Sequence, residues 1–246
     1  SLGPVKGFKK YDLGVVKMEV ARNTMPDIKF LKKVRDFCTR KKIILIFDEC
    51  TSGFRRNFGG IHMNINIFPD IAMFGKALGN GYPITSVIGK ADIMNKASKS
   101  FISSTLWSEG IGFSAAIATL KEMKRIKSWK KLIKNGKNIN SKWIALAKKH
   151  SLSIKLFGIE SISSFSLNKK KDLMYKTFIT QELMKSNILG SNLIYCNIYH
   201  SNKLMEKYFN VLDRIFKKIS DFESGENCMN YLNGPVCRKP FKRINS

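Results

Sequence analysis

The segment Ile43–Phe47 is a run of five consecutive apolar residues with no polar alternation. Such a run is typical of a strand that is buried on both faces, as in a parallel sheet covered by helices. The segment that begins at Pro26 places apolar residues at three- and four-residue steps, which predicts a helix with one buried face. A β-branched run, Gly14–Val20, precedes that helix. This order predicts a βαβ unit and therefore an α/β fold.

The rest of the pattern divides the chain into three parts. Short apolar runs at Ile71–Phe74 and Ile84–Ile88, joined by Gly-rich loops, continue the α/β pattern and assign residues 1–120 to part of a large domain with a parallel or mixed sheet. Residues 121–150 are basic and predict connecting helices, with an expected break near Asn135 and Gly136. Residues 151–246 predict a smaller α+β domain, with strands at 153–157, 162–167 and 193–198, helices at 173–185 and 203–219, and a terminal loop or draped tail.

The charge of the chain is compatible with an acidic partner, because 44 basic and 18 acidic residues give a net charge of +26. Only nine of the basic residues are Arg, and the densest cluster, Lys121–Lys137, is interleaved with apolar residues at helical spacing. Specific nucleic-acid contacts depend on Arg, and this cluster is typical of a solvated helix face, so nucleic-acid binding is not favoured. The five cysteines include no Cys-x-x-Cys pair and predict neither a disulfide framework nor a metal site.

The start of the chain bears on its location. No apolar run approaches the roughly 20 residues that span a bilayer, and SLGPVKGFKK lacks the apolar core of a signal peptide. We therefore expect a cytoplasmic protein with no membrane partner. The first residue is Ser1 rather than Met, which favours the later part of a longer chain.

Two residues whose side chains could take part in a reaction follow predicted strands. Asp48 comes directly after the buried run, and Lys76 comes after the next strand, flanked by Gly75, Gly79 and Gly81. Ligands of open α/β sheets bind beyond the carboxyl ends of the strands, and a buried carboxylate there needs a cation nearby. The alternative is a capping carboxylate and a solvated amine, since the chain has 35 Lys residues. Spacing alone leaves both interpretations open.

Three longer strings favour the first interpretation: IFDECTSGFRRNFGG, FPDIAMFGKALGNGYPITSVIG and FISSTLWSEGIGFSAAIATL. In this order and spacing they resemble class III pyridoxal-phosphate-dependent aminotransferases, above all the group that contains glutamate-1-semialdehyde 2,1-aminomutase. The resemblance covers most of the chain. It implies the type I fold of pyridoxal-phosphate-dependent transferases, with an incomplete large-domain sheet and a smaller α+β carboxyl-terminal domain. The motifs that carry it are Asp48-Glu49, Ser52–Arg55, Pro69-Asp70 and Gly75-Lys76 with the following Gly-rich loop and Pro83.

The resemblance assigns roles to four residues. It implies that Lys76 forms a Schiff base with pyridoxal phosphate and that Asp48 holds the protonated pyridine nitrogen, which keeps the ring able to accept electrons. Cys50 stands where the family usually has Val against the cofactor ring, which implies a packing contact. Thr105 matches a segment that reaches the cofactor phosphate of the neighbouring subunit. A homodimer with shared active sites is therefore implied.

The chain also departs from the family pattern. Thr51 replaces the Gln or Met that relatives often carry, and His62 falls in a variable loop, where a surface position is expected. Arg238 and Arg243 are expected in a solvated tail. The phosphate-binding loop and the stacking aromatic residue of the family are missing before Asp48. The chain thus looks like the carboxyl-terminal portion of an aminotransferase, which on its own is expected to bind pyridoxal phosphate weakly or not at all.

Three functions remain open. The resemblance implies transfer of an amino group between a small-molecule amino donor and a carbonyl acceptor. Intramolecular transfer, the aminomutase reaction, would use the same Lys76 and Asp48. The third function, from another class, is a non-catalytic basic binding protein that keeps the fold without its chemistry.

Overall fold

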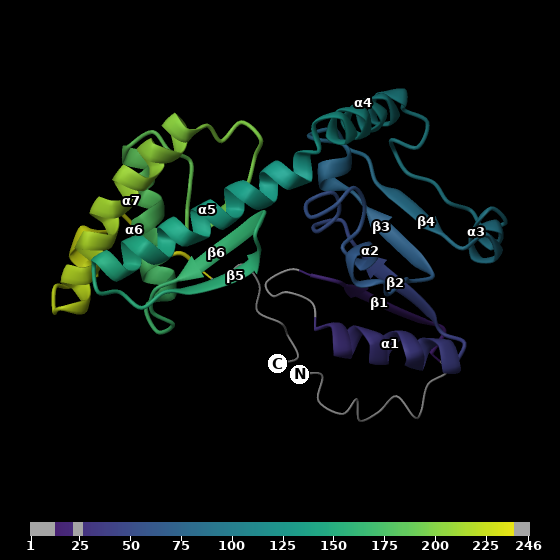
Figure 1. The fold of residues 1–246 in the computed structure, drawn as a ribbon, viewed down its shortest axis with the longest axis horizontal. Coiled ribbons are helices and arrows are strands. Elements are labelled where there is room, and N and C mark those ends of the chain that lie inside the picture. The colour runs from purple at the N-terminus through teal and green to yellow at the C-terminus, as the bar shows by residue number, and fades with distance from the viewer. Residues whose placement is uncertain (1–12, 22–26, 239–246) are drawn as a thin grey trace. The chain divides into compact units, whose positions relative to one another are not determined.

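The computed structural model describes residues 13–21 and 27–238 (Figure 1). It divides into two units, one that ends at Lys130 and one that begins at Lys131. The first unit contains the strands β1 (Val15–Glu19), β2 (Ile44–Asp48), β3 (Ile71–Phe74) and β4 (Ser86–Gly89), the helices α1 (Ile28–Arg40), α2 (His62–Ile65), α3 (Ala91–Ala97) and α4 (Gly110–Ile126), and the 3-10 turn η2 (Lys76–Leu78).

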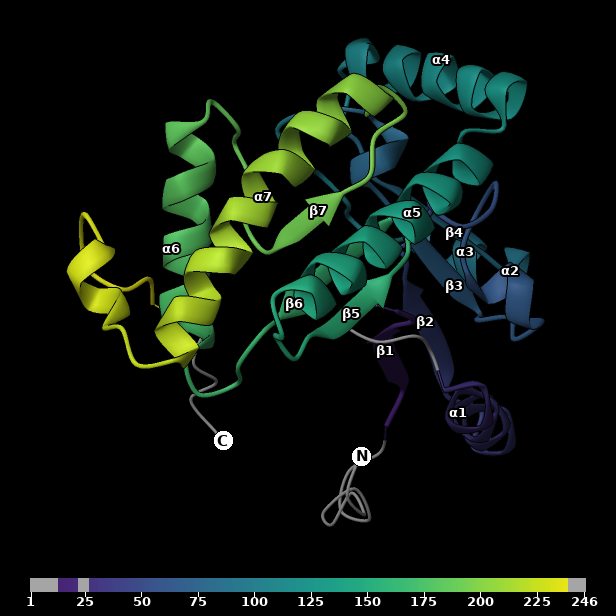
Figure 2. The same cartoon turned by 60° about the vertical axis from the view of Figure 1, so that its left-hand side comes forward.

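The sheet of the first unit has the strand order β1-β2-β3-β4, and β2 pairs in parallel with both of its neighbours (Figures 1 and 2). β4 runs antiparallel to β3, so the predicted parallel or mixed sheet is confirmed as a mixed one. Leu45 and Phe47 in β2 are fully buried, as the apolar run requires. The strand begins one residue later than that run and ends at Asp48, which is therefore part of the strand.

The predicted helix between β1 and β2 is confirmed as α1. The side chain of Asp27 caps it by accepting hydrogen bonds from the backbone N–H groups of Lys29 (3.0 Å) and Phe30 (3.2 Å). Its apolar face buries Leu31 and Cys38. Pro26, where the sequence places the start of the helix, lies outside the described residues.

Asp70, the residue before β3, is 6% exposed and contacts several elements of this unit. Its Oδ2 accepts hydrogen bonds from the backbone N–H of Leu45 (2.8 Å) and from Nη1 of Arg35 (2.8 Å), and its Oδ1 lies 2.6 Å from Nζ of Lys90. Burial alone raises the pKa of the Asp70 carboxyl, but these donors outweigh burial and hold the pKa below its usual value. In this chain the Pro69-Asp70 motif therefore joins β2, α1 and the start of α3.

The second unit has three antiparallel strands in the order β5-β6-β7, with helices α6 and α7 side by side (Figures 1 and 2). Its core combines aromatic and aliphatic side chains, and Nε1 of Trp143 donates a hydrogen bond to the buried hydroxyl of Tyr208 (2.9 Å). The elements are α5 (Ser128–Lys149), within which the unit boundary lies, β5 (Lys155–Ile159), β6 (Ile162–Ser166), α6 (Asp172–Lys185), β7 (Leu193–Tyr195), α7 (Asn202–Glu223) and the 3-10 turn η3 (Cys228–Tyr231).

The predicted helix break near Asn135 and Gly136 is wrong, because α5 continues through both residues. The chain turns at Lys127 instead, which has a left-handed φ of 49° between α4 and α5. Gly136 serves a close approach: a Cβ atom there would lie 1.8 Å from the backbone oxygen of Glu160, in the turn between β5 and β6. The glycine lets the helix pack against that turn.

Replacing Gly136 by Ala is expected to destabilise the second unit by about 3 kcal/mol, although Ala favours a helix over Gly by about 1 kcal/mol. The reason is that the new methyl group meets backbone atoms, which cannot rotate away. Hydrogen exchange across α5 during denaturant unfolding measures the effect. The control is Gly110→Ala in α4, where a Cβ atom meets nothing within 4 Å. Equal exchange in both variants would contradict the close approach.

The terminal segment is the predicted loop with one short turn, η3, in which Cys228 is buried. It lies along α6, because the backbone N–H of Asn233 donates to Oε1 of Gln181 (2.7 Å) and that of Cys237 to Oγ1 of Thr177 (2.9 Å). Arg238 is exposed and Arg243 lies outside the described residues. Within those residues, no helix is both long and apolar enough to cross a membrane.

Candidate active site

The two residues of the predicted pair lie at the ends of adjacent strands. Asp48 is the last residue of β2 and stands opposite Met73 of β3. β3 ends at Phe74, and Gly75 then leads into the turn η2, which begins with Lys76. β2 and β3 are parallel neighbours (Figure 1). Both residues therefore come to the same carboxyl edge of the sheet, where α/β proteins bind ligands.

The carboxylate of Asp48 is mostly buried, with 21% of its side chain exposed, and has two partners. Its Oδ1 accepts a hydrogen bond from the backbone N–H of Cys50 (3.1 Å), and its Oδ2 lies 3.1 Å from Nζ of Lys17 on β1. Burial raises the pKa of Asp48, but the hydrogen bonds from Cys50 and Lys17 outweigh burial and bring the pKa below its usual value. Asp48 is therefore an ionised group beside a cation.

The amine of Lys76 is exposed and donates a hydrogen bond to the hydroxyl of Thr51 (3.0 Å). The backbone of Lys76 has a φ of 45°, a left-handed conformation that is costly for a residue with a Cβ atom. The turn that imposes this conformation is tight, since a Cβ atom on Gly79 would lie 2.2 Å from the backbone oxygen of Tyr82. The turn thus fixes where the Lys76 side chain starts, and Thr51 contacts its end.

Cys50 links the two halves of this site. Its backbone N–H donates a hydrogen bond to Asp48 (3.1 Å), and the charges of Asp48, Lys76 and Lys17 all act on its thiol. Burial first, and then the Asp48 carboxylate, raise the pKa of the Cys50 thiol above its usual value, so the group is a protonated packing side chain rather than a nucleophile. A Cβ atom on Gly75 would lie 3.5 Å from Sγ of Cys50, which brings the loop of Lys76 against this thiol.

His62 is buried, and its predicted surface position is wrong. Its Nδ1 lies 2.9 Å from Oε1 of Glu49, which also accepts a hydrogen bond from the backbone N–H of His62 (3.0 Å), while the hydroxyl of Ser52 donates to Oε2. Glu49 is fully buried, because it directly follows β2 and continues the alternation of that strand, which turns it away from the side of Asp48. This network fastens the loop after β2 to the strand end.

Thr105 lies apart from this network. It is exposed in the turn before α4, and no hydrogen bond between described residues joins it to Asp48 or Lys76. Large apolar side chains around it are exposed as well, among them Phe101 (96%) and Trp107 (60%). The structure therefore brings Asp48, Cys50 and Lys76 together and leaves Thr105 on an apolar surface.

Lys17 is the contact residue that the sequence analysis does not single out. It is the one charged residue between Gly14 and Met18, in a run that is otherwise apolar. A charged side chain in such a strand indicates that an oppositely charged partner lies nearby in the sheet. The parallel pairing of β1 with β2 places Glu19 opposite Asp48, so Lys17 reaches Asp48 diagonally. That diagonal follows from strand register, which a sequence alone does not specify.

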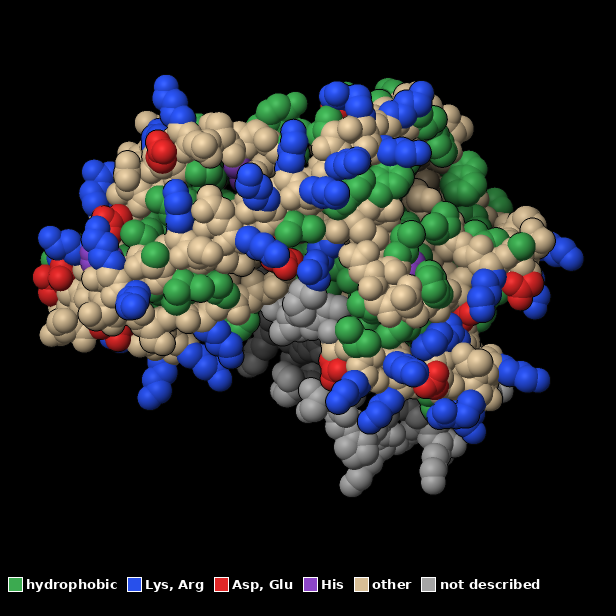
Figure 3. Space-filling model, viewed as in Figure 1, with side chains coloured by type: hydrophobic (Ala, Val, Ile, Leu, Met, Phe, Trp, Pro, Cys, Tyr) green, Lys and Arg blue, Asp and Glu red, His purple; other side chains and the backbone are tan. Residues whose placement is uncertain are grey.

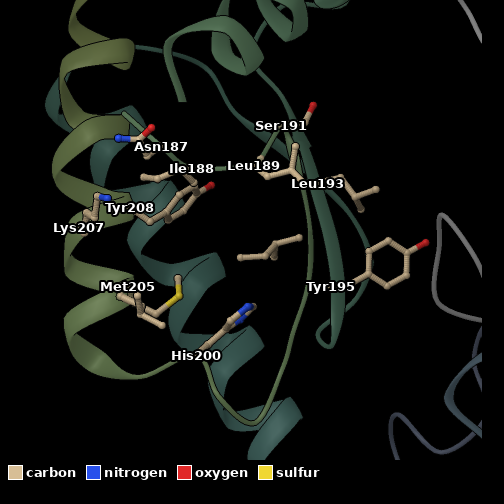
Figure 4. Close-up of a pocket in the computed structure, with 13 residues that line it drawn as sticks. Asn187, Ile188, Leu189, Ser191, Leu193, Tyr195, His200, Met205, Lys207 and Tyr208 are labelled. Atoms are coloured by element: carbon tan, nitrogen blue, oxygen red, sulfur yellow. The ribbon is translucent and has the colours of Figure 1, made fainter. Parts of the chain in front are cut away.

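A pocket of about 470 Å³ lies in the second unit (Figure 4). Its lining comes from the segment Asn187–Ser191, β7 and the start of α7, and includes His200, whose pKa is lowered by burial. No carboxylate lines it, and it contains none of the predicted site residues. The catalytic candidates therefore remain at the sheet edge of the first unit.

The architecture is that of known transaminases. The structure superposes on the PLP internal aldimine form of the FumI protein from Sphingopyxis sp. with a TM-score of 0.83 and 20% identity, over 91% of this chain and 56% of that one. Together with the mixed sheet, in which β2 ends at Asp48 and β3 is followed by the turn that begins with Lys76, this defines the type I fold of pyridoxal-phosphate-dependent transferases.

Residues 23–181, more than half of the chain, match the family model of aminotransferase class-III. The chain belongs to the class III aminotransferase family.

Two curated relatives illustrate the range of the family. A glutamate-1-semialdehyde 2,1-aminomutase from Bdellovibrio bacteriovorus is 41% identical over 103 residues, which cover 41% of this chain and 24% of the relative. A 3-aminobutyryl-CoA aminotransferase from Cloacimonas acidaminovorans is 29% identical over 168 residues, which cover 67% of this chain and 41% of the relative. This chain thus spans about half the length of its relatives or less.

The residues at the sheet edge fit the cofactor of this family, pyridoxal phosphate. An exposed primary amine at Lys76 suits its aldehyde, and an ionised carboxylate at Asp48 suits a protonated ring nitrogen. Gly75, at the start of the loop that carries Lys76, lies within van der Waals contact of Cys50, the residue whose backbone N–H binds Asp48.

Proposed function

We propose that this chain carries the amine and the carboxylate of a site for pyridoxal-phosphate-dependent transfer of an amino group between an amino donor and a carbonyl acceptor. The observation that carries the proposal is the placement of Asp48 and Lys76 at the ends of adjacent parallel strands, with Cys50 in reach of both charges. Membership of the class III family and the name of the aminotransferase relative support it.

The side chains of this chain have separate tasks. When bound, pyridoxal phosphate supplies an aldehyde that condenses with amines and a ring that accepts electrons. The amine of Lys76 would hold the group at its aldehyde and, as a free amine, would take and return a proton at a substrate carbon. The carboxylate of Asp48 would hold the ring nitrogen in its protonated form, and the lowered pKa of Asp48 keeps the carboxylate charged for this task. Cys50 lies beside Asp48 through its backbone hydrogen bond and contacts the loop that carries Lys76 at Gly75.

Intramolecular transfer, the aminomutase reaction, is the second candidate. The 41% identical relative carries that name, and the reaction needs the same amine and carboxylate. The two functions differ in the acceptor. Amino-group transfer consumes an added carbonyl compound, whereas the aminomutase reaction proceeds without one, so the requirement for an added acceptor separates them.

The experiment that tests the site is borohydride trapping, which makes even a transient adduct permanent and therefore does not require the tight binding that this chain is not expected to show on its own. The chain is mixed with an equimolar amount of pyridoxal phosphate, reduced, digested and analysed by mass spectrometry. Because a built site raises the effective concentration of its amine, we expect the pyridoxyl adduct at Lys76 to exceed the average over the other lysines at least about tenfold. Adducts spread evenly over the 35 lysines, together with salt-sensitive retention on DNA, would favour the non-catalytic basic binding protein instead.

We also propose that the partner of this chain is a second copy. The segment 101–107 and α4 present exposed apolar side chains on the first unit, including Phe101 (96%), Trp107 (60%) and Phe113 (58%). A patch of this kind marks an interaction surface. Thr105 lies within it, as expected of a residue that serves the neighbouring subunit. Lys and Arg are scattered over the face shown in Figure 3 rather than gathered in one patch, which gives an acidic partner no single docking area there.

Replacing Phe113 by Asp is expected to weaken self-association at least about tenfold, because an aromatic anchor is exchanged for a charge that must be desolvated in the interface. Sedimentation velocity over a range of concentrations measures the change. Ile144→Asp on α5, where the side chain is 48% exposed, is the control and should leave self-association unaltered. A wild-type chain that stays monomeric throughout that range would contradict the proposal.

A further inference from the structure

We propose that Thr51 is a positioning residue for Lys76, an inference that rests on the proposed function of the pair. The hydroxyl of Thr51 lies 3.0 Å from Nζ of Lys76, although the two residues are 25 positions apart in the sequence. The contact joins the turn after β2 to the turn after β3. It is the one hydrogen bond that the structure gives to the amine among the described residues.

The position of Thr51 is set by its backbone. Its carbonyl oxygen accepts a hydrogen bond from Nε of Arg55 (2.9 Å), and the next residue, Ser52, is buried with its hydroxyl on Glu49. The backbone N–H of Gly53 donates to the carbonyl oxygen of Glu49 (2.7 Å), which closes the turn. A β-branched side chain on such a turn has few rotamers, so the direction of its hydroxyl is restricted as well.

Lys76 needs such a partner because only the start of its side chain is fixed. The left-handed backbone at φ 45° sets the Cβ direction, but the methylene chain beyond it is flexible and exposed. A hydroxyl can accept a hydrogen bond from an ammonium group and donate one to a neutral amine. Thr51 can therefore hold Nζ in both protonation states, which a residue that gives and takes protons requires.

The Asp48 carboxylate is not the group that directs the Lys76 amine. The Asp48 carboxylate is already paired with Lys17 at 3.1 Å and with the backbone N–H of Cys50. An ion pair would favour the charged, unreactive form of the Lys76 amine, whereas a neutral hydroxyl directs the amine without that preference. The geometry thus separates the carboxylate that serves the ring nitrogen from the group that directs the amine.

The test compares Thr51→Val, which keeps the shape and loses the hydroxyl, with Thr51→Ser, which keeps the hydroxyl. Each chain is reduced with borohydride once in the presence of pyridoxal phosphate and once in the presence of formaldehyde, which is too small to need a directed amine. We expect the pyridoxyl adduct at Lys76 to fall about tenfold in Thr51→Val and to stay within about twofold in Thr51→Ser. Methylation of Lys76 by formaldehyde should stay within about twofold in both. Thr39→Val, on the exposed hydroxyl of α1, is the matched control and should match the wild type in both reactions.

The outcomes separate the two proposals. A wild-type adduct selective for Lys76 that persists in Thr51→Val overturns the role of Thr51 and leaves the proposed function standing. A parallel loss of both reactions in Thr51→Val shows that the amine has become covered, which also overturns a positioning role. The absence of a selective adduct in the wild type overturns the proposed function and this inference with it.

Discussion

A chain with Lys76 replaced by Met is expected to lose all selective attachment of pyridoxal phosphate. The remaining lysines should then react at the same low level as in the wild type, because none of them begins the turn after β3, and Lys17, which does lie beside Asp48, is engaged in its ion pair with that carboxylate. In the wild type the yield of the pyridoxyl adduct at Lys76 should exceed the average yield at the other lysines at least about tenfold, because a directed amine reacts faster than a solvated one. This excess should be absent from the Lys76→Met chain. Borohydride trapping with peptide mass spectrometry measures it.

Lys96→Met on α3 is the matched control, since it removes one exposed amine from the same unit. It should leave the adduct at Lys76 unchanged. If the Lys76→Met chain instead gained a new selective adduct at Lys17, the amine of the site would be the one that contacts Asp48, and the roles proposed for the two lysines would have to be exchanged.

Replacing Glu49 by Ala is expected to destabilise the first unit by about 3–5 kcal/mol, the range for removing one partner of a buried charged network. The fully buried carboxylate satisfies the Ser52 hydroxyl and two hydrogen-bond donors of His62, all of which would lose their partner. The backbone also packs tightly around this carboxylate, because a Cβ atom on Gly60 would lie 2.4 Å from the His62 ring and 2.8 Å from Oε1 of Glu49. Hydrogen exchange across β2 measures the loss. Glu122→Ala, which removes an exposed carboxylate from α4, should cost less than about 1 kcal/mol.

The same carboxylate gives the first unit a pH dependence with a defined sign. Burial raises the pKa of Glu49, but hydrogen bonds from His62 and Ser52 outweigh burial and lower it in the folded state. A group with a lowered folded pKa stabilises the fold above its unfolded pKa of about 4.3, and this stabilisation is lost as the pH falls through the folded value. The difference in stability between wild type and Glu49→Gln should therefore shrink as the pH falls below about 4. A difference that grows on acidification would show that the network holds a protonated Glu49.

Much of the fold follows from the sequence because apolar periodicity records burial. The run Ile43–Phe47 and the helical spacing before it lead directly to β2 and α1. The predicted helix break near Gly136 is wrong for a reason that no local pattern contains. The backbone of Glu160, in the turn between β5 and β6, occupies the space that a Cβ atom at position 136 would fill. A glycine within a helix signals either a break or a close approach, and only the packed structure separates the two.

The candidate site also contains residues that the sequence predicts and contacts that only the folded structure reveals. Asp48 and Lys76 stand out in the sequence because strand ends and glycines can be recognised locally, and the structure places both at one edge of the sheet. The burial of His62 depends on its pairing with Glu49, thirteen residues earlier, and a lone histidine in a loop gives no sign of that partner. The contact of Thr51 with Lys76 likewise depends on two turns that meet only after β2 and β3 have paired.

The pairing of β2 with β3 makes the relative placement of Asp48 and Lys76 independent of the chain that joins them. Hydrogen bonds between the two strands hold that placement, so residues added between α2 and β3, around the exposed Phe68, would extend the surface without moving either side chain. A slip of one residue in the strand pairing would instead turn the side chains of β3 to the opposite face. The relative placement of Asp48 and Lys76 is thus insensitive to the length of this connection and sensitive to a shift of one residue between the strands.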